Sequence, residues 1–222
     1  MTRFVLIPGA GGVAWYWSRV AALLQEAGAE AIPVDLPGDD PAAGLAAYVE
    51  LIAATVDGRR DTVLVAQSLG GFCAPLVARR VPVRAIVFVN AMIPEPGELV
   101  GDWWAATGSE SARTAAAAER GYPAEFDLHT YFLHDVDPAV AAEGEPYQRP
   151  ETDAVFDSAC DFESWPDVAV RVVAGADDRF FPLEFQRRVS RERLGIEPDV
   201  VPGGHLAALS QPRALADYLL AV

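Results

Sequence analysis

Short, nearly continuous apolar runs recur along the chain, and segments with helical spacing of apolar residues stand between most of them. Strands buried on both faces have such continuous runs, and the helices that cover them supply the alternation. The pattern predicts an α/β fold with a doubly wound, mostly parallel sheet. The expected strands are Arg3–Ile7, Ala31–Asp35, Thr62–Ala66, Ala85–Asn90, Val170–Ala174 and Glu197–Val201, and the expected helices are Tyr16–Ala27, Leu45–Val56, Phe72–Arg80, Leu183–Arg193 and Leu206–Val222.

Residues 92–165 connect the fourth and fifth predicted strands and are far longer than an ordinary connection. They include an alanine-rich, helix-forming stretch, Ser111–Arg120, and they carry most of the net charge of −15. We therefore expect a single domain over residues 1–222, in which residues 92–165 form a helical lid over the edge where the strands end.

Composition narrows the classes of protein that this chain can represent. Apolar residues make up 51% of the chain, but no run of about 18 consecutive apolar residues occurs, which indicates a soluble protein. Cys73 and Cys160 are too few for a disulfide framework or a thiolate metal site, and no secretory signal is visible, so we expect a cytoplasmic protein. The acidic charge argues against nucleic acid and anionic membranes as partners.

The stretch Thr62–Gly71 places a serine between a buried strand and a predicted helix. Such a tight turn tolerates only small side chains two positions before and after the serine, here Ala66 and Gly70. The turn exposes the Ser68 hydroxyl and directs the N-terminal N–H groups of the helix at the same place, so one feature supplies a nucleophile and an anion stabiliser. The alternative is that Ser68 only caps the helix.

A nucleophilic serine needs a base, and the base needs a carboxylate that orients it. His205 follows a strand end and a flexible turn, Val200–Gly204, and opens the last predicted helix. Two acids, Asp177 and Asp178, lie on the turn after the fifth strand; one can orient the base while the other serves the turn. The chain order serine, acid, histidine is that of one serine-hydrolase arrangement.

The glycine-rich segment Pro8–Gly12 follows the first strand, and its backbone could supply the second N–H of an oxyanion hole beside that of Leu69. The same segment, read as Gly9–Ala14 with Asp35 at the end of the second strand, also matches a dinucleotide-binding fingerprint, which predicts an NAD(P)-dependent reductase. The bulk of Trp15–Trp17 and the absence of lysine from the chain count against the reductase.

With these motifs in place, the chain resembles the α/β-hydrolase superfamily from end to end. The likeness lies in Phe4–Gly12, in the turn at Ser68 and in Gly203–Leu206. Asp35–Gly38 and Phe132–Val136 are similar to segments of the plant methylesterase and hydroxynitrile lyase branch, so the chain looks like a small bacterial relative of that branch.

The resemblance selects residues among the alternatives. Its register after the fifth strand implies that Asp178 is the acid, and its oxyanion donor after the first strand falls on Ala10. Pro8 and Ala66 depart from the usual residues of the family, but neither position supplies a reacting group. Cyanohydrin-cleaving relatives carry a lysine after the histidine; Leu206 stands there, which favours ester hydrolysis.

The resulting prediction is a serine esterase in which Ser68, His205 and Asp178 act on a small carboxylic ester, with no metal or organic cofactor. An acidic lid favours neutral or cationic substrates over anionic ones. A third alternative is a receptor that binds a small molecule on the same fold with little turnover. The pocket is expected between the sheet edge and the lid, and its candidate apolar lining is Trp103, Trp104, Tyr131 and Phe132.

Overall fold

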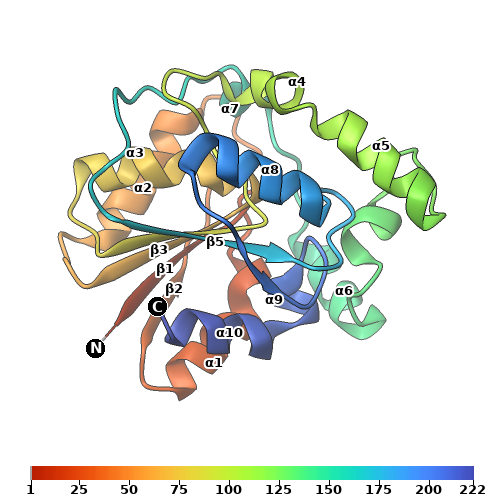
Figure 1. The fold of residues 1–222 in the computed structure, drawn as a ribbon. Helices are drawn as coiled ribbons and strands as arrows, with labels where there is room; N and C mark the ends of the chain where they lie inside the picture. The colour runs from red at the N-terminus through yellow and green to blue at the C-terminus, as the bar shows by residue number, and fades with distance from the viewer. Residues whose placement is uncertain (1) are drawn as a thin grey trace.

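The computed structural model describes residues 2–222, in which six strands form one sheet (Figure 1). Every neighbouring pair is parallel, in the order β2-β1-β3-β4-β5-β6, so the carboxyl ends of all strands lie at one edge. The predicted doubly wound fold is confirmed. The strands are β1 (Arg3–Ile7), β2 (Glu30–Pro33), β3 (Thr62–Gln67), β4 (Ala85–Val89), β5 (Ala169–Gly175) and β6 (Asp199–Val201).

Helices cover both faces of the sheet (Figure 1). On one face α1 (Ser18–Glu26) and α10 (Pro212–Leu220) pack against each other and the sheet. The opposite face carries α2 (Leu45–Val56), α3 (Cys73–Arg80) and α8 (Leu183–Leu194). None of the helices within residues 2–222 is long and apolar enough to cross a membrane.

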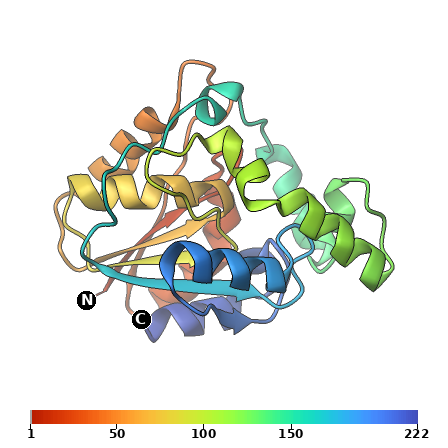
Figure 2. The ribbon, with the colours of Figure 1, turned by 45° about the horizontal axis from the view of Figure 1, so that its top comes forward.

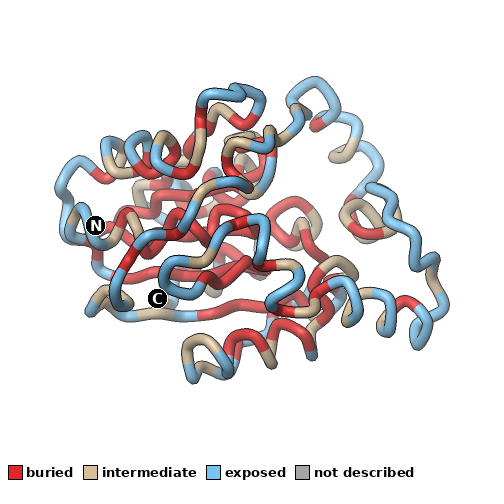
Figure 3. The backbone as a smooth tube through the Cα atoms, turned by 90° about the horizontal axis from the view of Figure 1, so that it is seen from above, coloured by how far each residue is buried: buried red, intermediate tan, exposed pale blue. Residues whose placement is uncertain are grey.

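The strands are apolar throughout because each of their faces is buried in a core. In β1, Val5 and Ile7 belong to the core beneath α2, α3 and α8, whereas Phe4 and Leu6 belong to the core beneath α1 and α10. Successive side chains of a strand point to opposite faces, so a two-sided sheet needs both sets to be apolar. Figure 3 shows the resulting buried centre, with exposed positions on the surrounding helices and loops.

Two predicted helices begin or divide differently in the structure. The predicted helix Leu206–Val222 is two helices, α9 (Ala207–Ser210) and α10, because Pro212 cannot continue a helix but fits the first turn of a new one. The predicted helix Tyr16–Ala27 begins with a 3₁₀ turn, η1 (Ala14–Trp17), before α1.

The long connection, residues 92–165 and called the insertion below, is largely helical and lies at the side of the sheet where the strands end (Figure 2). It adds no strand to the sheet within the described residues. Its elements are η3 (Val100–Asp102), α4 (Trp103–Thr107), α5 (Ser109–Arg120), the π-helical turn η4 (His129–Leu133), α6 (Pro138–Gly144), η5 (Glu145–Tyr147) and α7 (Asp153–Phe156).

The turn after β3 packs directly against the loop after β1. A Cβ atom at Gly70 would lie 2.5 Å from the carbonyl oxygen of Pro8 and 2.9 Å from the Ile7 side chain. One at Gly9 would lie 2.9 Å from the Cβ of Ser68. Glycine at these positions therefore lets the two loops approach closely at the carboxyl edge.

We expect Gly70→Ala to lower the free energy of unfolding by about 3 kcal/mol, because the new methyl group must displace backbone atoms. Chemical denaturation measures the loss. Gly28→Ala is the control, since a Cβ there meets nothing within 4 Å and costs about 1 kcal/mol through its left-handed backbone alone. Equal losses in the two variants would contradict the close packing.

Candidate active site

Ser68 stands on a sharp turn between β3 and α3. It is the first residue of a short 3₁₀ helix, η2 (Ser68–Phe72), and its φ of 50° lies in the left-handed region that side chains other than glycine rarely adopt. Such a conformation costs on the order of 1–3 kcal/mol and persists only where its surroundings hold it. Two sets of contacts stabilise this conformation. Strand β3 pairs with both of its neighbours, and the Met92 N–H donates a hydrogen bond to the Ser68 carbonyl oxygen (2.9 Å).

The structure brings three side chains from distant parts of the chain into one hydrogen-bonded line. His205 Nε2 lies 3.1 Å from Ser68 Oγ, and His205 Nδ1 lies 2.9 Å from Asp178 Oδ2. Each of the three residues is buried. Because a carboxylate only accepts hydrogen bonds, Nδ1 carries the imidazole proton and Nε2 is left to accept one from the serine.

The Asp178 carboxylate is 1% exposed and is compensated by four hydrogen bonds. Its Oδ1 accepts the N–H groups of Phe180 (2.8 Å) and Phe181 (2.9 Å), and its Oδ2 accepts Gln186 Nε2 (3.2 Å) besides the histidine. Its neighbour Asp177 is exposed, and the backbone N–H of Asp177 bonds to the carbonyl oxygen of Gly203. Of the two acids on this turn, Asp178 is the one that meets the histidine.

Asn90 joins the acid loop to the histidine loop and was not predicted from the sequence. It follows β4 with a φ of 47° and is fully buried. Its Nδ2 donates to the carbonyl oxygens of Gly204 (2.9 Å) and His205 (3.2 Å), and its Oδ1 accepts the N–H of Gly175 (2.7 Å) and the amide of Gln186 (3.3 Å). The one available signal was a polar residue directly after a buried strand.

Aromatic rings and the insertion enclose the histidine. The rings of Phe132, Phe180 and Phe181 lie edge-on or nearly so to the imidazole, with centroids 4.8–5.0 Å away. From the insertion, Asp135 Oδ2 accepts the N–H of Gly204 at 2.6 Å. The imidazole is therefore held in a dry environment, in which its interactions with charge are stronger than in water.

The insertion also forms hydrogen bonds to the glycine-rich loop after β1. Glu151 accepts the Gly11 N–H (2.8 Å) and the Tyr48 hydroxyl (2.5 Å), and Arg149 donates to the carbonyl oxygens of Gly11 (2.5 Å) and Gly12 (2.9 Å). Burial raises the pKa of the Glu151 carboxyl above its usual value, partly offset by these hydrogen bonds. Hydrogen bonds from the insertion therefore fix both N–H and carbonyl groups of this loop.

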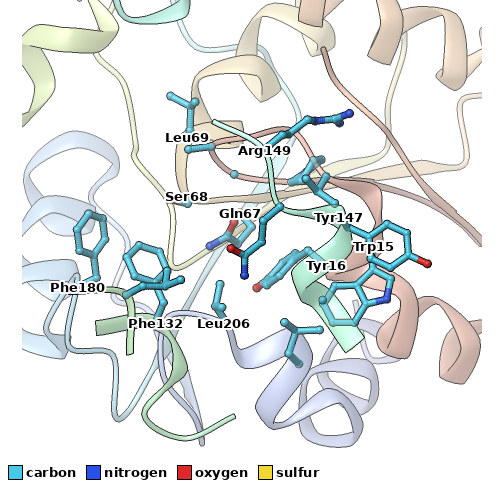
Figure 4. A pocket seen from close by; sticks show the side chains of 18 of the residues that line it. Trp15, Tyr16, Gln67, Ser68, Leu69, Phe132, Tyr147, Arg149, Phe180 and Leu206 are labelled. Atoms are coloured by element: carbon cyan, nitrogen blue, oxygen red, sulfur yellow. The ribbon is translucent and has the colours of Figure 1, made fainter. Parts of the chain in front are cut away.

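A cavity of about 380 Å³ opens beside Ser68 (Figure 4). Ala10 and Leu69 line it together with the serine, and the Ala10 N–H donates no hydrogen bond to any of residues 2–222. Leu69 is the second residue of η2, where a helical N–H has no partner within the helix. The aromatic part of the wall consists of Trp15, Tyr16, Trp104, Phe132, Tyr147, Phe156 and Phe180.

Two of the four predicted lining residues face the cavity and two do not. Trp104 and Phe132 line it. Trp103 is fully buried against Phe181, and its indole N–H donates to the carbonyl oxygen of Ile93. Tyr131 is also fully buried and bonds to backbone oxygens of the insertion. The prediction for Trp103 and Tyr131 is wrong, because both rings fill the packing beneath the cavity wall.

The residues of the dinucleotide-binding fingerprint make other contacts within the protein. Asp35 Oδ1 accepts the N–H of Ala14 (3.0 Å) and pairs with Arg149 (3.0 Å). Trp15 and Tyr16 occupy the wall of the cavity directly after the glycine-rich loop. Aromatic bulk therefore stands where a pyrophosphate would need close approach to the helix start.

We expect Asn90→Ala to lower the free energy of unfolding by about 2–4 kcal/mol, since it leaves buried groups of both loops without partners. Thermal or chemical unfolding measures this. Gln25→Ala is the control, because Gln25 makes a single, partly buried bond to the carbonyl oxygen of Ala31. A loss no greater than that of the control would show that Asn90 does not hold the loops together.

Comparison with known proteins agrees with this geometry. The model of the alpha/beta hydrolase family matches residues 4–218. The probable esterase PIR7A of rice, Oryza sativa, is 29% identical over 99% of this chain and 96% of its own, and methylesterase 7 of Arabidopsis thaliana is 35% identical over 42% and 41%. An extracellular alpha/beta-hydrolase from a Paenibacillus species superposes with a TM-score of 0.80 at 18% identity, covering 100% of this chain and 98% of that one. The predicted similarity to plant methylesterases is confirmed, and the chain belongs to the alpha/beta hydrolase family.

Proposed function

We propose that this protein hydrolyses a small carboxylic ester through an acyl-enzyme intermediate. The observation that carries the proposal is the unbroken line from Ser68 Oγ through the His205 ring to Asp178, at 3.1 and 2.9 Å, which opens on an apolar cavity. A serine with a base and an orienting acid is the arrangement that acyl transfer requires. Sequence similarity to proteins named as an esterase and a methylesterase supports the same activity.

In the first half-reaction, Ser68 Oγ attacks the ester carbonyl carbon while His205 Nε2 takes the hydroxyl proton. The tetrahedral intermediate collapses, the bond to the alcohol oxygen breaks, and His205 returns the proton to that leaving oxygen. In the second half-reaction, His205 removes a proton from water, whose oxygen attacks the acyl carbon. The bond between that carbon and Ser68 Oγ then breaks, His205 returns the proton to Ser68 Oγ, and the acid is released. Asp178 stabilises the imidazolium that forms in each step.

The N–H groups of Ala10 and Leu69 bind the developing oxyanion in this proposal. Both residues line the cavity beside Ser68, and neither N–H has another acceptor among the described residues. A donor of this kind contributes about 3 kcal/mol to transition-state stabilisation. The bonds from Glu151 and Arg149 to the adjacent Gly11 keep the donor loop in place while charge develops.

The cavity favours a neutral, largely apolar ester. Its charged lining residue, Arg149, already donates to three carbonyl oxygens and pairs with Asp35, so it is not free to bind a substrate carboxylate. The acidic residues of the insertion further disfavour anions.

We expect Ser68→Ala to lower kcat/KM for short 4-nitrophenyl esters by about 10⁴-fold or more, because no nucleophile remains. Release of nitrophenolate measures the rate. Ser111→Ala, an exposed position on α5, is the control and should retain activity. Full activity in Ser68→Ala would contradict the proposal. Tight binding of small molecules without turnover by the natural chain would identify a receptor instead.

The two neighbouring acids offer a matched test of the acid's role. We expect Asp178→Asn to lower kcat/KM by about 10⁴-fold, since an amide can no longer hold the productive imidazole tautomer. Asp177→Asn makes the same chemical change on an exposed neighbour and should leave kcat/KM within about twofold of the natural chain. The reverse pattern would transfer the role to Asp177.

A further inference from the structure

Tyr16 brings a hydroxyl group to the aromatic part of the cavity wall. It lies in η1, directly after the glycine-rich loop, and its ring packs edge-on to Trp17 with centroids 4.9 Å apart. The residue is 8% exposed and lines the cavity beside Ser68. Figure 4 shows its hydroxyl end directed inward among the lining side chains.

The Tyr16 hydroxyl donates a hydrogen bond to no acceptor among residues 2–222. Leaving a buried hydroxyl unpaired costs about 1–3 kcal/mol, so such groups call for an explanation. Two other tyrosines pair theirs: Tyr48 donates to Glu151, and Tyr131 donates to the carbonyl oxygen of Pro123. Tyr122 also has a buried hydroxyl without a partner, but Tyr122 does not line the cavity and Tyr16 does.

The protonation state makes this hydroxyl a donor. Burial raises the pKa of Tyr16 well above its ordinary value of 10; the nearby backbone N–H of Ala208 lowers it in part, and the charges of Asp178 and Asp135 raise it further. The phenol therefore keeps its proton throughout the physiological range. It offers that proton to an acceptor inside the cavity.

Three other polar groups of the wall are already in use. Arg149 bonds to backbone carbonyl oxygens and Asp35, and Ser68 is hydrogen-bonded to His205. Gln67 directs its amide nitrogen at the carbonyl oxygen of His205. Tyr16 makes no hydrogen bond to the Ser68, His205 or Asp178 side chains, which separates it from the reacting groups.

We propose that Tyr16 is a specificity-determining residue, whose hydroxyl donates a hydrogen bond to a neutral acceptor oxygen on the substrate. The preferred substrate is then an apolar ester that carries a second oxygen, as a ketone, ether or alcohol, away from the ester group. This inference rests on the proposed ester hydrolysis and names the substrate class of that site. A hydrocarbon ester leaves the hydroxyl unpaired, and an ester with the second oxygen pairs it.

A series of matched esters tests the proposal. The probes are 4-nitrophenyl hexanoate and its analogues in which a ketone replaces each chain methylene in turn, so that the second oxygen is offered at each distance from the ester along the chain. For each analogue, kcat/KM is divided by that of the parent ester, first in the natural chain and then in Tyr16→Phe. Comparison of the two ratios cancels the intrinsic reactivity of each analogue.

For the analogue whose oxygen meets the hydroxyl, we expect the ratio to fall by about tenfold in Tyr16→Phe. Tyr122→Phe is the matched control: Tyr122 also has a buried, unpartnered hydroxyl, but it does not line the cavity. The control should leave every ratio unchanged. The melting temperature of Tyr16→Phe should not fall, since the hydroxyl donates no hydrogen bond within residues 2–222.

Ratios that are the same in Tyr16→Phe and the natural chain at every position would overturn the inference, as would an equal loss for all esters. A fall in melting temperature with no change in the ratios would assign the hydroxyl a structural role and also overturn it. Failure of the proposed function has a different signature, namely that the natural chain hydrolyses none of the esters or that Ser68→Ala hydrolyses them equally well.

Discussion

The burial of one carboxylate constrains the whole carboxyl edge of the sheet. Asp178 is almost fully removed from water, and a buried charge is tolerated only where hydrogen bonds replace its hydration. Its four donors come from its own turn, from α8 and from the loop after β6. These elements can therefore occupy few positions relative to one another. The geometry of the Ser68–His205 pair follows from that restriction, since His205 is both a donor to the carboxylate and the neighbour of the serine.

Parallel topology brings the remaining parts to the same edge. Because every strand runs in the same direction, the loops after β1, β3, β4, β5 and β6 emerge together, and the glycine-rich loop, Ser68, Asn90 and Asp178 follow their strands directly. Asn90 then connects the loops after β5 and β6 through one buried amide. Close packing at Gly70 does the same for the loops after β1 and β3. Strained backbone at Ser68 and Asn90 is held by these contacts, as expected where surroundings over-determine a conformation.

Features with a local sequence signature were predictable, and features that depend on which face a side chain takes were not. The strands and the Ser68 turn have local patterns, and the structure places both as expected. The choice between Asp177 and Asp178 required a family register, because two acids on one turn have the same local pattern. Trp103 and Tyr131 lie in an irregular insertion, where aromatic content indicates burial but not whether a ring faces a cavity or the core. A single buried amide such as that of Asn90 is not marked by any periodic pattern in the sequence. Its role is visible only in the folded structure, where the loops that it connects lie side by side.

The insertion is more than a cover over the cavity, because it bonds to both loops that serve the proposed reaction. Glu151 and Arg149 hold the glycine-rich loop on one side, and Asp135 holds the loop before His205 on the other. The same segment supplies Phe132 and Tyr147 to the cavity wall. A change in the insertion that reshapes the wall will therefore also shift the proposed oxyanion donors or the proposed base, so in the proposed reaction substrate choice and rate are coupled through shared contacts. Tyr16 lies outside the insertion on the short helix after the glycine-rich loop, where its hydroxyl can select substrates without disturbing either anchor.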